Sequence, residues 1–73
     1  MNPNDVSSKD ELVAFLHTLR HDLTDNATSW ENQTLESFLE AMAAWLNDSD
    51  DANSKTPTWS LLATSLLAGK AYE

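Results

Sequence analysis

The sequence predicts an all-α fold, a small three-helix bundle. Apolar residues recur at spacings of three and four in three separate stretches, which is the pattern of one helix face. The chain has one glycine and no Asn-Gly or Asp-Gly pair, so the usual tight turns of β-hairpins are missing. Polar connections of about eight residues favour three helices that run up, down and up around one core.

The first helix is predicted over residues 9–24. Ser8 and Glu11 have the spacing of a capping box, in which each side chain bonds the backbone at the start of a helix. The run Thr24-Asp25-Asn26 ends the apolar pattern. We expect residues 1–7 to be a disordered lead-in. The predicted core stripe of this helix consists of Leu12, Phe15, Leu16, Leu19 and Leu23.

The second helix is predicted over residues 34–47, with Asn32 or Thr34 as its cap. Trp30 lies just before that cap, where it can fold back onto the first apolar turn as a hydrophobic staple does. The apolar side chains fall within a face roughly 120° wide, which we expect to be core. They are Leu35, Phe38, Leu39, Met42, Trp45 and Leu46.

The third helix is predicted over residues 57–71, with Thr56 as its cap and Pro57 at its first position. It is apolar on two sides, so it is either sandwiched between neighbours or exposed to a partner. The expected core stripe is Trp59, Leu62, Ala63 and Leu66. The opposite stripe is Leu61, Ala68 and Tyr72. We expect this second stripe to bind a partner or a second copy; the alternative is that Val6 or Trp30 covers it.

Composition limits the classes of function. The 73 residues form a single domain near the lower size limit for one hydrophobic core, and no cysteine is present to add disulfides or thiolate-bound zinc. The net charge of −8 repels phosphate backbones and anionic membranes and attracts basic protein surfaces. The chain shows neither a signal peptide pattern nor a membrane-spanning run, which predicts a cytoplasmic protein without direct nucleic-acid or membrane binding.

Candidate catalytic and metal-binding groups are few. His17, His21 and Asp25 share a helix face, but a fourth ligand for a metal is missing. Glu36 and Glu40 lie one turn apart, with nothing apolar beside them to separate their pKa values for acid–base chemistry. The acidic run at Asp48, Asp50 and Asp51 lacks the glycine and final glutamate of a calcium loop. The sequence therefore predicts a non-enzyme without metal or cofactor.

The chain resembles a family of small, uncharacterised bacterial helical proteins. The likeness rests on a block of the form W-E-N-x-T-L-x-x-F-L-E-A-x-A-A-W, which here begins at Trp30 and ends at Trp45. A closing P-x-W helix follows, with Pro57 and Trp59 here, and ends near Tyr72-Glu73. The resemblance implies a compact helical domain from about Ser8 onward and carries over no catalytic or ligand residue.

We expect a small acidic, non-catalytic protein-binding module that masks a basic surface of a partner, as immunity proteins and antitoxins do. The alternative is a housekeeping accessory protein or a homo-oligomeric structural protein, so the partner is another protein with a basic surface or a second copy in a homodimer. The acidic candidates for the binding surface are Glu36, Glu40, Asp48, Asp50 and Asp51. The apolar candidates are Leu61, Ala68 and Tyr72.

Overall fold

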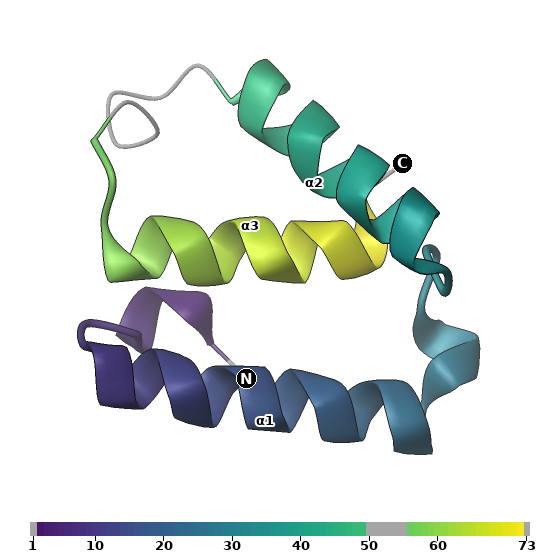
Figure 1. The fold of residues 1–73 in the computed structure, drawn as a ribbon, viewed down its shortest axis with the longest axis horizontal. Coiled ribbons are helices and arrows are strands. Elements are labelled where there is room, and N and C mark those ends of the chain that lie inside the picture. The colour runs from purple at the N-terminus through teal and green to yellow at the C-terminus, as the bar shows by residue number, and fades with distance from the viewer. Residues whose placement is uncertain (1, 50–55, 73) are drawn as a thin grey trace.

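A computed structural model of the chain describes residues 2–49 and 56–72, and in these residues the secondary structure is entirely helical (Figure 1). Three α-helices run up, down and up, which confirms the predicted fold class. The elements in chain order are η1 (Pro3–Asp5), α1 (Lys9–Asp25), η2 (Ala27–Ser29), α2 (Leu35–Asp48) and α3 (Trp59–Ala71).

Local capping fixes where α1 and α2 begin. The Ser8 hydroxyl accepts a hydrogen bond from the Glu11 N–H at 3.1 Å, and the Glu11 carboxylate reaches back to the Ser7 N–H at 3.3 Å. The Thr34 hydroxyl accepts from the Ser37 N–H at 3.1 Å. The Ser8 cap and the Thr34 alternative are therefore confirmed, because each hydroxyl accepts from an N–H that the helix leaves unpaired. The return bond of the capping box differs from the prediction, because the Glu11 carboxylate accepts from the backbone of Ser7, one residue before the cap, and from the Ser8 hydroxyl.

The start of α3 was predicted two residues too early. Thr58 caps the helix by accepting from the Leu61 N–H at 2.9 Å, and α3 begins at Trp59. Pro57 therefore precedes the cap and is not the first helical residue. Thr56 and Thr58 are both threonines with equal capping chemistry, so the sequence alone does not distinguish them.

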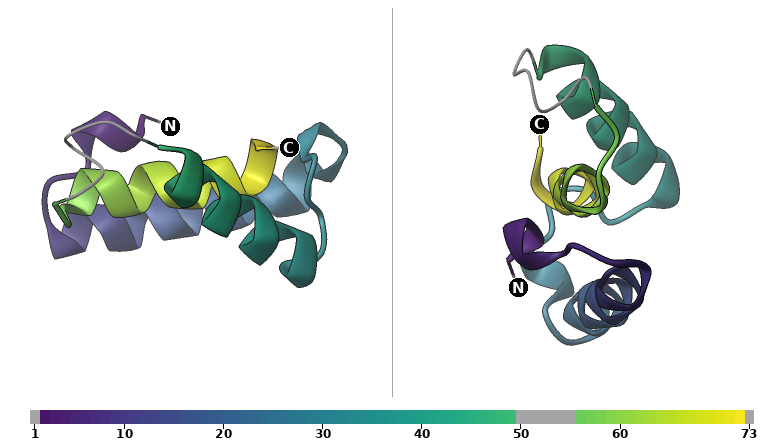
Figure 2. Two further views of the ribbon diagram at one scale, coloured as in Figure 1. Left: turned by 90° about the horizontal axis from the view of Figure 1, so that it is seen from above. Right: turned by 90° about the vertical axis from the view of Figure 1, so that its left-hand side faces the viewer.

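The last helix of the chain lies at the centre of the fold. α1 and α2 lie on opposite sides of α3, and both pack mainly against it (Figures 1 and 2). The most buried residues of α3 are the small ones, Ala63, Ser65 and Gly69. Small side chains allow both neighbours to approach closely. Of the two alternatives for a helix that is apolar on two sides, the structure shows the sandwiched one.

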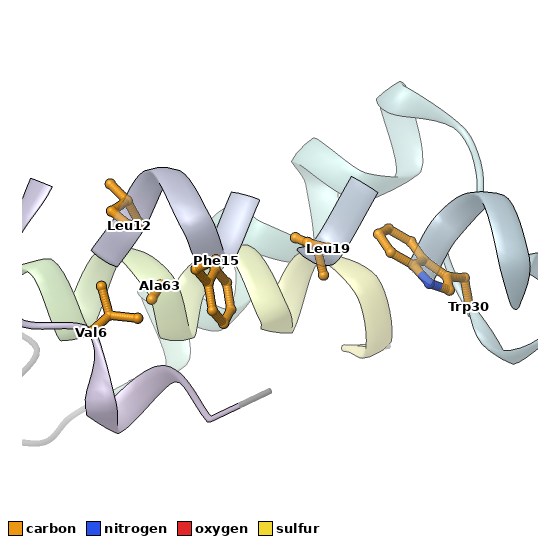
Figure 3. Close-up of a cluster of buried hydrophobic side chains, with 6 residues drawn as sticks. All are labelled: Val6, Leu12, Phe15, Leu19, Trp30 and Ala63. Carbon is orange, nitrogen blue, oxygen red and sulfur yellow. The ribbon is translucent and has the colours of Figure 1, made fainter. Parts of the chain in front are cut away.

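The core runs along the interface of α1 and α3, from Val6 at one end to Trp30 at the other (Figure 3). It consists of Val6, Leu12, Phe15, Leu19, Trp30 and Ala63. The predicted disordered lead-in instead contributes to this core. Residues Pro3–Asp5 form η1, which packs against α3, and Val6 is only 5% exposed. A single buried valine in a polar segment has no periodicity, which is why the pattern did not reveal it.

Several leucines predicted as core are exposed. On α2, the exposed fraction is 73% for Leu35, 54% for Leu39 and 40% for Leu46, whereas Ala41 is buried. Further residues of the predicted stripes, also more than a third exposed, are Leu16 and Leu23 of α1 and Trp59 and Leu62 of α3. The prediction was wrong for these seven because α1 and α2 each pack mainly on one neighbour, α3, which covers only part of a 120° apolar face.

Truncation of Leu39 should therefore have little effect on stability. We expect Leu39→Ala to lower the free energy of unfolding by no more than about 1 kcal/mol, because a half-exposed side chain loses little apolar burial on truncation. Urea denaturation followed by circular dichroism measures this change. A loss of about 2 kcal/mol or more would show that Leu39 is buried in solution.

Candidate functional site

An apolar groove opens between α1 and α2. Both helices pack on α3 rather than on each other (Figure 2), and α3 contributes Leu66 to the lining of the groove. Leu16 and Leu23 line the α1 wall, and Leu35 and Phe38 line the α2 wall. The groove has a volume of about 330 Å³. We name this hollow the leucine groove.

A cationic side chain lines the leucine groove, and the carboxylates of α2 lie outside its lining. Arg20 lines the α1 side and is exposed. On α2, the exposed carboxylates Glu36 and Glu40 each follow directly after an exposed leucine, Leu35 and Leu39. At about 100° per residue, Glu36 and Glu40 lie about 100° and 140° around α2 from Leu35, and neither is among the residues that line the groove.

The other acidic candidates lie apart from this groove. Asp48 ends α2, and its carboxylate accepts a hydrogen bond from the Tyr72 hydroxyl. That bond raises the pKa of Tyr72, because the phenol donates to a negative group. The candidates Asp50 and Asp51 lie outside the described residues.

The second stripe of α3 turns toward α2. Leu61, Ala68 and Tyr72 are all half-buried, and Tyr72 connects the end of α3 to Asp48 of α2. Leu61 lines a second hollow, of about 820 Å³, together with Val6 and residues of α2. The structure therefore brings Asp48 and Tyr72 together and places Val6 near Leu61, while Glu36 and Glu40 are exposed on α2 and do not line the leucine groove.

Trp30 is the centre of a polar cluster that closes one end of the core. Its Nε1–H donates to Asp22 Oδ2 at 2.8 Å, and Lys70 Nζ lies 2.6 Å from the same oxygen. Lys70 Nζ also lies 5.6 Å from the centroid of the Trp30 ring, and that ring stacks on Phe38 at 6.2 Å. The predicted staple is confirmed. The roles of Asp22 and Lys70 were missed, because they are 48 positions apart and no local pattern pairs them.

Asn32 closes the end of α3 rather than the start of α2. Its side-chain amide donates to the Tyr72 carbonyl at 2.8 Å, and its backbone N–H donates to the Lys70 carbonyl at 3.2 Å. The last carbonyls of a helix have no partner within the helix, so these bonds satisfy groups that α3 leaves open. The Trp-Glu-Asn segment is therefore mainly structural: Trp30 and Asn32 join all three helices, while Glu31 is exposed.

Acid should weaken the contact between Asp22 and its partners. The hydrogen bond from Lys70, and then that from Trp30, hold the pKa of the Asp22 carboxyl below its ordinary value of 3.8. Because the folded-state pKa is lower than the unfolded-state pKa, the carboxylate stabilises the fold above the unfolded value. That stabilisation is lost as the pH falls through the folded-state pKa.

We expect Asp22→Asn to be less stable than the parent at neutral pH, with the difference narrowing below about pH 4. Urea denaturation over this pH range measures both proteins. Asp25→Asn, at an exposed position on the same helix, is the matched control and should change stability by no more than about 0.5 kcal/mol. A difference between Asp22→Asn and the parent that stays constant with pH would contradict the assigned role.

Other candidate sites receive no support from the geometry. Within residues 2–49 and 56–72, no three His, Asp or Glu side chains are grouped so that they could hold a metal ion. His17 and His21 are exposed on α1. None of the described helices has the length and apolar character needed to cross a bilayer. The leucine groove is therefore the candidate site, and its lining suits apolar side chains of another molecule.

Comparison with known proteins gives a family but no function. Neither a curated protein nor a solved structure matches the chain. The matched family is described as a family of unknown function, and the match covers residues 8–73. These residues include α1, α2, α3 and the Trp-Glu-Asn segment, whereas η1 and Val6 precede them. The chain therefore belongs to the family of unknown function DUF7660.

Proposed function

We propose that this chain is a small acidic, non-catalytic module of the cytoplasm that binds another protein and masks a basic surface on it, in the manner of an immunity protein or an antitoxin. The observation that carries the proposal is the leucine groove on a chain of net charge −8. Its exposed leucines include Leu35, at 73%. Apolar patches exposed beside polar residues are typical of protein–protein interfaces.

Charge gives the proposed interaction its selectivity. Glu36 and Glu40 are exposed on α2, the helix that forms one wall of the groove, so a basic partner that docks on α2 would meet them. Charges at the rim of an interface act mainly on the association rate, and at 0.15 M salt their field decays over about 8 Å. Association with a basic partner should therefore slow as the salt concentration rises.

The test is purification of the chain from its native host at low salt, identification of the retained proteins by mass spectrometry, and kinetic measurement with the purified partner. We expect Glu36→Gln/Glu40→Gln to slow association more than Asp5→Asn/Asp10→Asn does. Both variants remove two negative charges, but only the first pair lies on α2, which forms one wall of the leucine groove. An association rate that is independent of salt and equal in the two variants would refute the proposal.

The second candidate is a homo-oligomer, either structural or accessory to a housekeeping process. The exposed Leu35 and Leu39 favour it, because monomers seldom leave such side chains together in water. Light scattering of the purified chain tests this alternative. A dimer that dissociates in Leu35→Glu, with the helical circular dichroism spectrum unchanged, would favour the homo-oligomer over a partner of another kind.

A further inference from the structure

The α1 side of the leucine groove runs from a buried residue to exposed ones. At about 100° per residue, the lining residues of α1 follow one another around the helix in the order Leu19, Leu23, Leu16 and Arg20. The exposed fraction rises in the same order, from 5% at Leu19 through 36% at Leu23 to 41% at Leu16, and Arg20 is exposed too. The groove is therefore deepest beside Leu19, and Arg20 lies at its mouth.

The deep part of the groove is lined by large apolar side chains from three further parts of the chain. Trp30 comes from the connection between α1 and α2, Phe38 from α2 and Leu66 from α3. Phe38 and Leu66 pack against the buried core, and Figure 3 shows Trp30 and Leu19 at the same end of that core. The Trp30 ring also stacks on Phe38. This apolar surface is therefore formed without a ligand.

Arg20 brings a positive charge to the groove and has no partner in the described part of the chain. The sequence has 12 acids and 4 lysines or arginines, yet none of the described residues that line the groove is an acid. Among residues 2–49 and 56–72, the Arg20 guanidinium makes neither an ion pair nor a hydrogen bond. The nearest acid in the sequence is Asp22, whose charge is compensated by Lys70. The mouth of the groove therefore carries an unused cation.

The other polar side chains of the lining already have partners. Asn32 and Gln33 donate their side-chain amides to backbone carbonyls, and the Thr34 hydroxyl caps α2. A ligand therefore gains its polar contact from Arg20. The planar guanidinium group of arginine suits a carboxylate, because two parallel N–H donors match its two oxygens.

The size of the groove suits a small molecule. Its volume of about 330 Å³ lies at the lower end of the range of about 300–1,000 Å³ that is typical of ligand sites. Such sites are lined mainly by apolar side chains, and a few polar groups fix the orientation of the ligand. A hollow with an apolar interior and one cation at its mouth is complementary to an apolar chain that ends in an anionic group.

We propose that the leucine groove binds an unbranched aliphatic monocarboxylate, that is, a medium-chain fatty acid. The hydrocarbon chain lies against Leu19, Trp30 and Phe38, and the carboxylate accepts hydrogen bonds from Arg20 at the mouth. This inference goes beyond the proposed protein-binding function and does not depend on it. A bound fatty acid and a partner protein that docks over the groove would compete for the same surface.

The test is a titration of the full, isotopically labelled chain with decanoate, below the concentration at which decanoate forms micelles, followed by NMR. The indole N–H signals report on separate places, because Trp30 lines the leucine groove and Trp59 lines the second hollow. Tryptophan-to-phenylalanine variants assign these signals. We expect the Trp30 signal to shift until it saturates and the Trp59 signal to stay in place.

Two further compounds isolate the role of the carboxylate. Decanol and decyltrimethylammonium have the same hydrocarbon chain with a neutral and a cationic head group. The net charge of −8 favours the cationic compound, so a preference for decanoate requires a local cation. We expect decanoate to bind at least about threefold more tightly than either compound.

Arg20→Gln tests the source of that preference, with Lys9→Gln as its matched control. Both variants remove one positive charge from an exposed position on α1, but Lys9 does not line the groove. We expect Arg20→Gln to abolish the preference for decanoate over decanol and to change decanol binding by less than about twofold. Lys9→Gln should keep the preference.

Leu16→Gln and Val13→Gln locate the hydrocarbon chain. The two side chains have similar exposed fractions, 41% and 45%, but only Leu16 lines the groove. We expect Leu16→Gln to weaken the binding of decanoate and of decanol at least about threefold, and Val13→Gln to change either by less than about twofold. The helical circular dichroism spectrum of each variant shows whether the fold is intact.

Several results would overturn the inference. A Trp30 signal that does not saturate, or that shifts together with the Trp59 signal, would mean adventitious binding of a hydrocarbon chain only. Equal binding of the three compounds, or a preference for decanoate that survives Arg20→Gln, would remove Arg20 from the site. Binding that Leu16→Gln leaves unchanged would place the ligand elsewhere. The salt dependence of association with a partner protein tests the proposed function separately.

Discussion

Trp30→Ala should lower the free energy of unfolding by about 3–5 kcal/mol, which is enough to unfold a domain of this size. Trp30 is 6% exposed, lies in the core cluster and stacks on Phe38 of α2. Its indole N–H also donates to Asp22, next to Lys70 of α3. Truncation leaves a cavity at the point where all three helices meet, so the loss exceeds that of one buried side chain on a single interface.

Trp30→Phe separates the ring from its polar group. The phenyl ring keeps much of the apolar contact but has no N–H to donate to Asp22. We expect the missing hydrogen bond to lower the free energy of unfolding by about 1–2 kcal/mol. The smaller size of the phenyl ring adds a further loss. Thermal and urea denaturation of both variants give the comparison. If Trp30→Ala melted within a few degrees of the parent, the assignment of Trp30 to the core would be wrong.

Gly69→Ala should lower the free energy of unfolding by about 1–3 kcal/mol, although alanine is the better helix former by about 1 kcal/mol. A Cβ atom at Gly69 would lie 2.7 Å from Cζ of Phe38, closer than two carbons can approach. The Phe38 ring is stacked on Trp30, so it cannot move aside without disturbing that contact.

The double variant Gly69→Ala/Phe38→Leu tests this explanation. Leucine has no ring atom at that position, so the cost of the alanine should be smaller in this background than in the parent. Denaturation of the four proteins of the cycle measures the coupling. A stabilising Gly69→Ala would mean that α2 and α3 separate more easily than the structure shows.

The helices were predictable because their signals are local. Ser8 with Glu11, and Thr34 before its apolar run, determine where helices begin through side chains within three residues, which a sequence displays directly. The start of α3 was missed only because two threonines compete for the same role. The order up, down and up followed from the short connections.

The arrangement of the helices was not predictable from the same patterns. Apolar periodicity identifies a face but not which neighbour covers it, so Leu35 and Leu39 were assigned to the core although both are exposed and Leu35 lines an open groove. The buried face of α3 consists of Ala63, Ser65 and Gly69, which hydrophobicity ranks low. Those residues are buried because helices approach closely there, and that proximity is a property of the folded chain.

The candidate site was predictable only in part. Glu36 and Glu40 were placed on the surface from helix geometry, and the structure shows them exposed. The leucine groove depends on how far α1 lies from α2, which no local pattern encodes. The link between Asp22 and Lys70 likewise joins residues 48 positions apart.

The central position of α3 has a consequence for how the protein forms during translation. A ribosome makes α1 and α2 first, and both then lack the helix on which each of them packs. The contacts that Val6, Trp30 and Asn32 make with α3 also cannot form before that helix has been synthesised. Neither end of the core is therefore closed until α3 is available. The domain therefore folds only after α3 has left the ribosomal exit tunnel, and until then the growing chain exposes its leucines to chaperones.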